Sequence, residues 1–483
     1  MLLRCIPIAL FTCSSLAVAQ RPGQTLFDDV VRALGGSDKV LAVQSLIVQG
    51  EGENYNLGQN ATPDTPLPTF GVTKYVRAYD FANRRWRLDQ TREPRFPAGN
   101  PAPQRQRFGY DVVAYDITSD TTMRRIGQRP TLDRRAELMY HPVGFIYAAL
   151  EPESRLAEES SADGTRRLRL DAGGERYTMV VDRRTRLPIR IERTVHNGML
   201  GDAVLSNDFS DWNVVSSVRL PMRIVQKLDG RMISDMKLTA PRANVVVGEL
   251  AIPESIRTAQ LQTPPVSVVV DSIASGVWYL TGGTHHSVAI EMKDGILLVE
   301  APHSEERTLA VIRTARGLRP GKPVRAVVNS HHHFDHAGGI RAALSEDLTI
   351  FTHAANAPFY QALANRRFTI QPDALAKGPK PANIQAVTTK RVLTDGSRIV
   401  ELHEIQGSVH SGSMLVAWMP AEKILIEADL YTPQAANLTT PAVVPFAKAL
   451  IQNIDRLGFA VERIVPLHGR VVPMSDLRRD AGT

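Results

Sequence analysis

Residues 331–336 have the pattern His-x-His-x-Asp-His, which places four side chains that could bind metal within six positions. Imidazole and carboxylate at this density suit zinc or a similar divalent ion. In an extended segment His331 and His333 project to the same side, because side chains alternate along the chain. Asp335 and His336 then follow and could reach a second position. The spacing therefore favours a metal centre over a solvated polar loop.

Further residues of ligand type follow later in the chain. All but two of the 13 histidines lie at or beyond His285. His410 lies in a loop of small residues, Asp429 follows the apolar run 424–426, and His468 follows the run 464–467. Strands that end on the same edge of a sheet would bring these side chains together.

The elements expected to position these residues are short strands and one helix. The largely apolar run 324–328 follows Pro323 and predicts a buried strand that delivers residues 331–336 into a loop. Ser304 could cap a helix that extends through Arg316, with two glutamates in its first turn. Three more strands are predicted at residues 277–280, 288–292 and 296–299.

From about Val266 to Thr483 the chain resembles the metallo-β-lactamase-fold hydrolase superfamily, on the motif at 331–336 and the three later residues of ligand type. The resemblance implies an αββα sandwich with two divalent ions at one sheet edge. Zinc is expected, with iron or manganese as alternatives. The resemblance implies that His331, His333 and His410 bind the first ion. It implies that Asp335, His336 and His468 bind the second ion and that Asp429 bridges the two.

The resemblance implies an enzyme that acts on a small molecule. A metal-bound hydroxide would attack an ester, lactone, thioester or amide (β-lactam-like) bond, and Asp335 could also orient the nucleophile or carry a proton. Tyr431 could donate a hydrogen bond to the oxyanion, with a packing role as the alternative. Hydrolysis of a phosphodiester or sulfate ester is a second enzyme hypothesis. A protein that binds a lipid or apolar metabolite, with the metal domain as a scaffold, is a hypothesis of another class.

Three positions near the motif stay open. Relatives usually end the third of the predicted strands with an aspartate-containing turn, whereas this chain has Glu300, which could orient a ligand. His285 and His286 lie in a turn that could approach the metal cleft, or could be plain polar residues. The other histidines considered are expected to point away from the ions or to be structural: His141, His196, His332, His353 and His403.

The preceding two hundred residues predict a β-rich domain. Short alternating runs recur, and Asp163-Gly164 and Asp229-Gly230 are typical of hairpin turns. Helices are expected over residues 24–44 and within 135–150. This half resembles periplasmic lipoprotein-carrier-type β domains. The predicted fold class is therefore α+β, with an antiparallel, curved sheet before the αββα sandwich. The first domain could hold an apolar ligand, form a dimer surface or cover the active site.

The domain boundaries follow from composition. Residues 1–19 have a basic start, an apolar stretch and the sequence Ala17-Val18-Ala19, which predicts a signal peptide and a periplasmic or secreted protein. Residues 20–257 form the first domain, 258–265 a proline-containing linker, and 266–483 the metal domain. A fragment that begins near Val266 is then expected to fold alone.

Composition excludes several partners and ligands. Both cysteines lie inside the predicted signal peptide, so no thiolate ligand is expected in the mature chain. The net charge of +7 is scattered rather than gathered in a basic arm, so no nucleic-acid partner is expected. No apolar run is long enough to predict an integral membrane span. The oligomeric state stays open.

Overall fold

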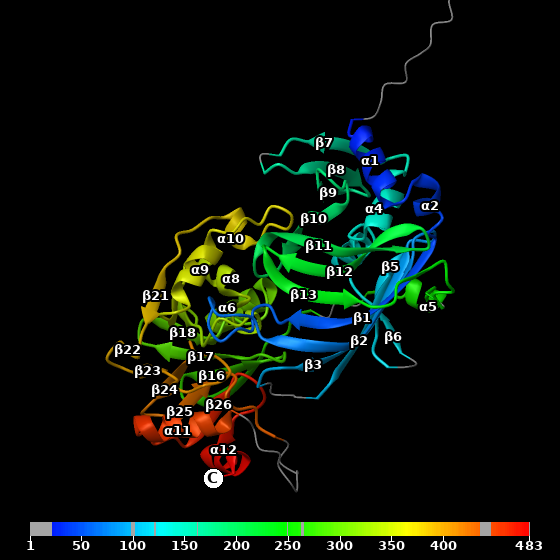
Figure 1. Cartoon of the computed structure of the whole chain (residues 1–483). Coiled ribbons are helices and arrows are strands. Elements are labelled where there is room, and N and C mark those ends of the chain that lie inside the picture. Colours follow the sequence, from blue (N-terminus) through cyan, green and yellow to red (C-terminus); the bar gives the residue numbers. More distant parts are fainter. Residues whose placement is uncertain are drawn as a thin grey trace, which may run out of the picture.

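The computed structural model describes residues 22–97, 102–119, 122–161, 163–248, 250–261, 265–434 and 446–482. The predicted signal peptide at 1–19 lies outside the described residues, as do residues 262–264 of the predicted linker. The described chain has one large sheet in its N-terminal half and two smaller sheets in its C-terminal half (Figure 1).

The N-terminal sheet has 14 strands, and its neighbouring strands pair antiparallel. Two meanders run outward from the central pair β1 and β13, which confirms the predicted antiparallel sheet. The strands are β1 (Ser45–Tyr55), β2 (Thr69–Asp80), β3 (Arg85–Pro94), β4 (Gln104–Asp111), β5 (Val113–Ile117), β6 (Met123–Arg125), β7 (Arg155–Glu159), β8 (Arg166–Ala172), β9 (Glu175–Val181), β10 (Pro188–Asn197), β11 (Gly201–Val215), β12 (Val218–Leu228), β13 (Arg231–Leu238) and β14 (Arg242–Ala243).

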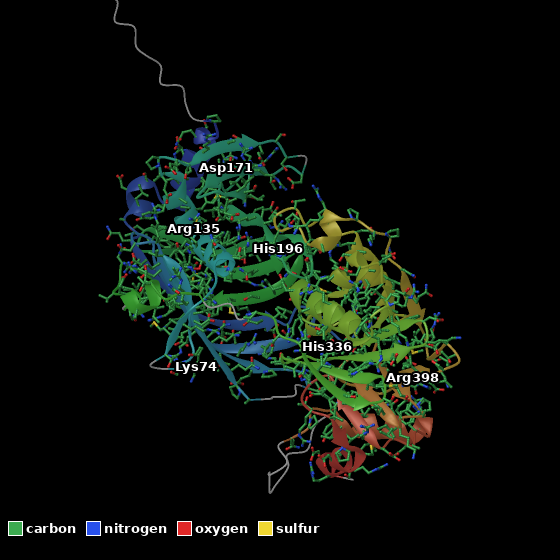
Figure 2. The ribbon with its side chains drawn as sticks, turned by 180° about the vertical axis from the view of Figure 1, so that it is seen from behind. Lys74, Arg135, Asp171, His196, His336 and Arg398 are labelled. Carbon is green, nitrogen blue, oxygen red and sulfur yellow. The ribbon has the colours of Figure 1, made fainter. Side chains whose placement is uncertain are left out.

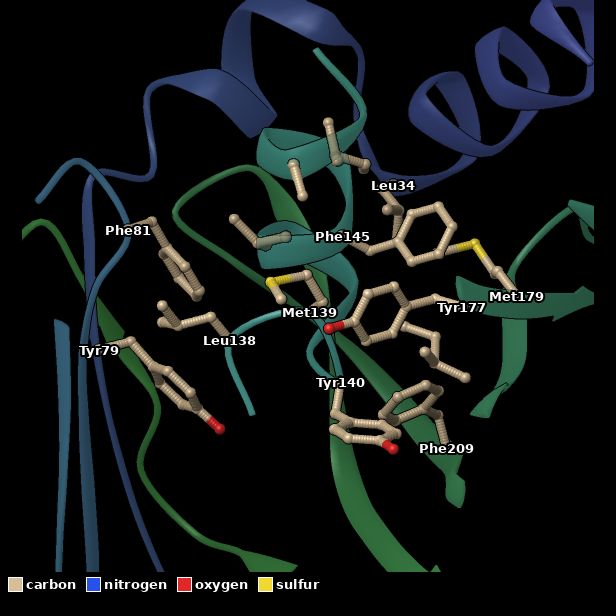
Figure 3. Close-up of a cluster of buried hydrophobic side chains, with 14 of the residues drawn as sticks. Leu34, Tyr79, Phe81, Leu138, Met139, Tyr140, Phe145, Tyr177, Met179 and Phe209 are labelled. Atoms are coloured by element: carbon tan, nitrogen blue, oxygen red, sulfur yellow. The ribbon is translucent and has the colours of Figure 1, made fainter. Parts of the chain in front are cut away.

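Helices pack on this sheet and close its apolar core. Phe145 and Met139 lie among side chains from the helical segment and the sheet, including Tyr177 and Met179 (Figure 3). The predicted helix over 24–44 is two helices, because the backbone N–H of Gly35 bonds back to the preceding turn and ends the first one. The helices of this half are α1 (Gln24–Leu34), α2 (Ser37–Leu41), α3 (Gln128–Ala136), α4 (Pro142–Ala149) and α5 (Glu254–Arg257).

The C-terminal half contains a seven-stranded sheet followed by a six-stranded sheet. The first comprises β15 (Val269–Ala274), β16 (Val277–Thr281), β17 (Ser287–Met292), β18 (Gly295–Val299), β19 (Val324–Val328), β20 (Thr349–His353) and β21 (Ile384–Val387). The second comprises β22 (Lys390–Thr394), β23 (Ile399–Glu404), β24 (Leu415–Met419), β25 (Ile424–Glu427), β26 (Arg463–Pro466) and β27 (Val472–Pro473). The helices are α6 (Glu305–Leu318), α7 (Phe334–Ala337), α8 (Ile340–Ser345), α9 (Ala357–Ala364), α10 (Ala374–Lys377), α11 (Ala447–Leu457) and α12 (Met474–Ala481).

The buried side chains of this half arrange the two sheets and their helices in four layers. One cluster joins the facing sides of the two sheets, through residues such as Ile290 and Ile426. A second packs the outer side of the first sheet against α6, α8 and α9, and a third packs the other sheet against α11 and α12. Alternation along the strands explains this, since neighbouring residues enter opposite clusters. The predicted αββα sandwich is confirmed.

The two halves share apolar core and hydrogen bonds. Met199 and Leu200 of the N-terminal half belong to the same buried cluster as Tyr360 and Leu363. The Asp202 carboxylate accepts hydrogen bonds from the backbone N–H and the hydroxyl of Thr369, and Figure 1 shows the two halves in contact along this region. Within the described residues, every helix is too short or too polar to cross a membrane.

Candidate metal centre

The residues of ligand type are carried by segments that follow the strands of the sandwich. His331 and His333 follow β19, and the short helix α7 carries Asp335 and His336. Figure 2 places His336 in the C-terminal half, on the side next to the N-terminal sheet. The later strands supply the others: His410 precedes β24, Asp429 follows β25 and His468 follows β26.

The structure brings all seven predicted ligands together in two adjoining groups. In each group the candidate ligand atoms lie within 4.8 Å of one another. His285, which the sequence left open, joins the second group and lies 3.1 Å from Asp335, measured from Nε2 to Oδ2. The first group is His331, His333, His410 and Asp429, and the second is His285, Asp335, His336 and His468.

Asp429 faces both groups with different oxygens. Its Oδ2 lies 2.7 Å from Nε2 of His410 and 3.3 Å from Nε2 of His331. Its Oδ1 lies 2.9 Å from Nε2 of His336 and 2.8 Å from Nε2 of His468. A carboxylate in this position can offer one oxygen to each of two cations.

Several of these atoms are buried and make no hydrogen bond, as is expected of atoms that bind a cation. Buried polar atoms in folded proteins nearly always have a partner, and an unpaired one is costly. The first group holds four such atoms, three of them on its histidines and the fourth on the Asp429 oxygen that faces the second group. They are Nε2 of His331, Nδ1 of His333, Nε2 of His410 and Oδ1 of Asp429. The residues present therefore fit divalent metal ions.

Comparison with known families agrees with this geometry. The family described as "Metallo-beta-lactamase superfamily" matches residues 280–433, which include the motif at 331–336, His410 and Asp429. Residues 280–433 form a metallo-beta-lactamase superfamily domain. This finding confirms the predicted family and the prediction of a hydrolase of that superfamily.

Individual relatives match only parts of the chain. A linear primary-alkylsulfatase from Pseudomonas sp is 34% identical over 80 residues, which span 15% of this chain and 12% of that protein. A metallo-beta-lactamase from Pontibacter korlensis is 22% identical, covers 45% of this chain and 98% of its own, and has a TM-score of 0.35. The metallo-beta-lactamase FIM-1 from Pseudomonas aeruginosa is 19% identical, covers 45% and 96%, and also scores 0.35.

Within the metallo-beta-lactamase domain, the second ring nitrogen of several ligands is held by a neighbour. Nδ1 of His336 lies 3.0 Å from Oε2 of Glu300, and Nδ1 of His468 lies 3.2 Å from the carbonyl oxygen of Thr284. Such contacts fix the orientation and tautomer of a ligating imidazole. Glu300 also accepts a hydrogen bond from Asn329, so it stands where the sequence suggested an orienting acid.

The surroundings of the site lower the pKa of His331 and His333 and of the carboxylates of Asp335 and Asp429. Burial lowers the pKa of His331 to about 3, and the positive His336 adds to this effect. Burial alone would lower the pKa of His336 too, but the carboxylates of Asp429 and Glu300 raise it well above its ordinary value. Burial raises the pKa of Asp429, yet the surrounding histidines outweigh this and hold it well below its usual range.

Tyr431 is not brought to the metallo-beta-lactamase site. Its ring is buried and its hydroxyl donates a 2.8 Å hydrogen bond to Asp480 in α12, so the packing alternative describes this position rather than the oxyanion role. Glu427 holds the same turn by accepting hydrogen bonds from the backbone N–H groups of Leu430 and Tyr431.

Four other histidines that the sequence singled out, His286, His332, His353 and His403, lie outside the two ligand groups. The ring of His286 packs edge-on against Tyr279, outside both groups. His332 lies 3.4 Å from Oδ1 of Asn60, and His353 and His403 each approach a surface glutamate. The last two contacts are structural.

Sequence reasoning missed two residues that reach the site from the other half of the chain. Nε2 of Gln59 donates a 2.9 Å hydrogen bond to Oδ1 of Asp335, and the carbonyl oxygen of Asn60 lies 3.0 Å from Nε2 of His333. Both lie in the loop between β1 and β2, and no pattern in that loop predicts a partner 270 residues away.

Proposed function

We propose that this protein is an exported, dinuclear metal-dependent hydrolase of a small-molecule ester, lactone, thioester or amide. The observation that carries the proposal is the position of Asp429, whose two carboxylate oxygens face two separate groups of imidazoles. An acid with only a structural role would need a partner at one oxygen. A carboxylate that bridges two cations must offer one oxygen to each of them. When bound, two divalent ions would supply an acidified water and stabilise negative charge on the substrate.

The residues of the chain would then hold and orient the reacting groups. Asp335 is the most exposed acid of the site, with 35% of its side chain accessible, and its two oxygens are turned by Gln59 and His285. Burial acts against ionisation of Asp335, but the hydrogen bond from His285 and the charge of His336 keep its pKa below the ordinary value. An ionised, oriented carboxylate at the cleft can accept a proton from an attacking water and return it to the leaving group.

Sulfate-ester hydrolysis is the second candidate, and the alkylsulfatase match favours it. That relative is named for a linear primary alkyl sulfate, a substrate with an anionic head and an apolar chain. In such a reaction, water would add across the ester bond and release an alcohol and inorganic sulfate. Zinc is the metal that we propose, because the ligand set consists of imidazole and carboxylate without thiolate.

A matched screen would test the proposal and separate its two candidates. Purified full-length protein would be assayed for metal content and for hydrolysis of lactone, thioester, β-lactam, phosphodiester and alkyl-sulfate substrates. We expect about two ions per chain. His333→Ala should lose most of one ion and most activity, whereas His353→Ala, outside both groups, should lose neither. Full activity with one ion would contradict the dinuclear site.

Export is proposed from residues 1–19 and has a direct test. The mass of the protein recovered from outside the cytoplasm should correspond to a chain that begins at Gln20. Recovery of the protein only with residues 1–19 attached, inside the cell, would contradict export without touching the hydrolase proposal.

A further inference from the structure

The loop between β1 and β2, residues 56–68, extends from the N-terminal sheet to the ligands of the metallo-beta-lactamase domain. We propose that this loop completes the metal centre: the Asn60 carbonyl holds His333 so that Nδ1 faces the first ion, and Gln59 positions Asp335 beside the second. The proposal rests on the proposed dinuclear site. It adds positioning residues that the C-terminal domain does not itself contain.

The state of the His333 ring is the first support. Its Nε2 lies 3.0 Å from the carbonyl oxygen of Asn60, whereas its Nδ1 is buried and makes no hydrogen bond. A carbonyl oxygen only accepts, so Nε2 must carry the proton, and Nδ1 keeps its lone pair. Metal-ligating histidines commonly have this arrangement, in which a carbonyl or carboxylate fixes the tautomer. Here that carbonyl comes from another domain.

The loop is itself held rigidly against both segments that carry ligands of the first ion. The buried side chain of Asn60 donates hydrogen bonds to the carbonyl oxygens of Thr62 and Thr65, which closes the loop on itself. The carbonyl oxygen of Ala61 accepts a 2.8 Å hydrogen bond from the backbone N–H of Gly412, two residues after His410. One short loop therefore contacts the surroundings of both His333 and His410.

Gly58 allows this close approach. Its carbonyl oxygen accepts a hydrogen bond from the backbone N–H of Phe334, the residue between His333 and Asp335. A Cβ atom on Gly58 would lie 2.3 Å from the Phe334 ring, and the φ of 76° is one that other residues rarely adopt. Any side chain at this position must lift the loop or displace the ring.

The contact of Gln59 with Asp335 extends the same support to the second ion. Gln59 binds Oδ1 of Asp335 at 2.9 Å, while His285 of the C-terminal domain binds Oδ2 at 3.1 Å. The two partners occupy different oxygens, so together they fix the plane of the carboxylate. Loss of the loop would leave the Asp335 carboxylate held by His285 at one oxygen alone.

The test compares two glycine substitutions in the full-length protein. Gly58→Ala introduces the clash with Phe334, and Gly164→Ala is its matched control, because Gly164 has a φ of 79° but no atom within 4 Å of its would-be Cβ. Zinc affinity is measured by competition with a chromophoric chelator. We expect Gly58→Ala to bind zinc about 10- to 100-fold more weakly than the parent, as is usual when a partner of a ligand is lost. Gly164→Ala should stay within about twofold of the parent.

Hydrogen exchange on the unmodified protein provides a second readout that needs no variant. If loop and metal are coupled, zinc must strengthen the docking of the loop as much as the loop strengthens zinc binding. Peptides covering residues 56–68 should therefore exchange more slowly with zinc than with chelator, although none of these residues is a ligand. Exchange that is unaffected by zinc, or parental zinc affinity in Gly58→Ala, would overturn the proposal. Failure of the parent to bind zinc would instead refute the metal centre.

Discussion

At the scale of single residues, the site depends on carboxylates that each contact several partners. Asp429 divides its oxygens between the two ligand groups, and Glu300 contacts both Asn329 and His336. Glu300 adopts a left-handed backbone, with a φ of 81°, and is fully buried. Strain of this kind persists only where the surrounding structure maintains it, and it is frequent at functional sites.

Asp429→Asn tests the bridge. The Asn side chain is nearly the same size as that of Asp. Because its amide is neutral, it cannot offset the repulsion between two cations. We expect hydrolysis to fall by about two to four orders of magnitude, or about 3–5 kcal/mol of transition-state stabilisation. Occupancy of the second ion should weaken in parallel when metal content and rate are measured across added zinc. Asp271→Asn, on an exposed strand, is the control. Two bound ions with near-normal turnover would show that another acid bridges.

Glu300→Gln tests the orienting acid. The substitution preserves the size of the side chain but removes the negative charge that faces Nδ1 of His336. We expect zinc affinity to fall about 10- to 100-fold in chelator competition, whereas the exposed Glu306→Gln should change it less than twofold. Equal zinc affinities for the Glu300→Gln and Glu306→Gln variants would show that the Glu300 carboxylate does not orient a ligand.

At the scale of helices and strands, the sequence predicted features formed by residues close together in the chain. It missed contacts between residues far apart in the chain. The motif at 331–336 spans six consecutive residues. Ser304 caps α6 by accepting a hydrogen bond from the backbone N–H of Arg307, as its position before two glutamates predicted. Residues 56–68 contain only the signals of an ordinary loop. Their role comes from tertiary contacts with residues about 270 positions later, which no periodicity encodes.

The helix α4 gives a prediction of pH dependence. His141 caps it, since Nδ1 accepts a hydrogen bond from the backbone N–H of Val143. Burial, aided by the charge of Arg77, lowers the pKa of His141 from 6.5 to about 3. The unfolded chain therefore binds a proton below pH 6.5 that the folded chain does not, so this contribution to stability is complete above pH 6.5. It is lost progressively as pH falls towards 3.

His141→Asn should flatten that profile, because Asn can also cap a helix but does not titrate. The parent should lose about 2 kcal/mol more of its free energy of unfolding between pH 7 and pH 5 than the variant does. Denaturant unfolding at the two pH values measures the difference. Parallel pH profiles for parent and variant would show that His141 is protonated in the folded protein.

At the scale of the whole molecule, the two halves share part of one apolar core. The apolar cluster that includes Met199 and Leu200 continues into the helices of the metallo-beta-lactamase domain. A fragment that begins near Val266 would expose this surface and would lack Gln59 and Asn60. The sheets before and after the predicted boundary at 258–265 therefore share part of a core.

Calorimetry tests whether the two halves unfold together. The full chain should unfold in a single transition, because separating the halves exposes shared core. Arg366→Ala removes hydrogen bonds to the carbonyl oxygens of Leu200 and Asp202 and should cost about 1 kcal/mol of stability. Two well-separated transitions in the parent would contradict a shared core, and the same experiment with zinc would show which half the metal stabilises.

The span between the loop and its partners also sets an order of events in synthesis. Asn60 precedes His333 by 273 residues, and His468 comes last of the candidate ligands. A chain made from its N-terminus therefore has the β1–β2 loop available long before the first ligand emerges. The candidate ligands from His331 to His468 are therefore made after the loop that contacts two of them. A metal site that includes His468 can therefore form only after this residue has been made.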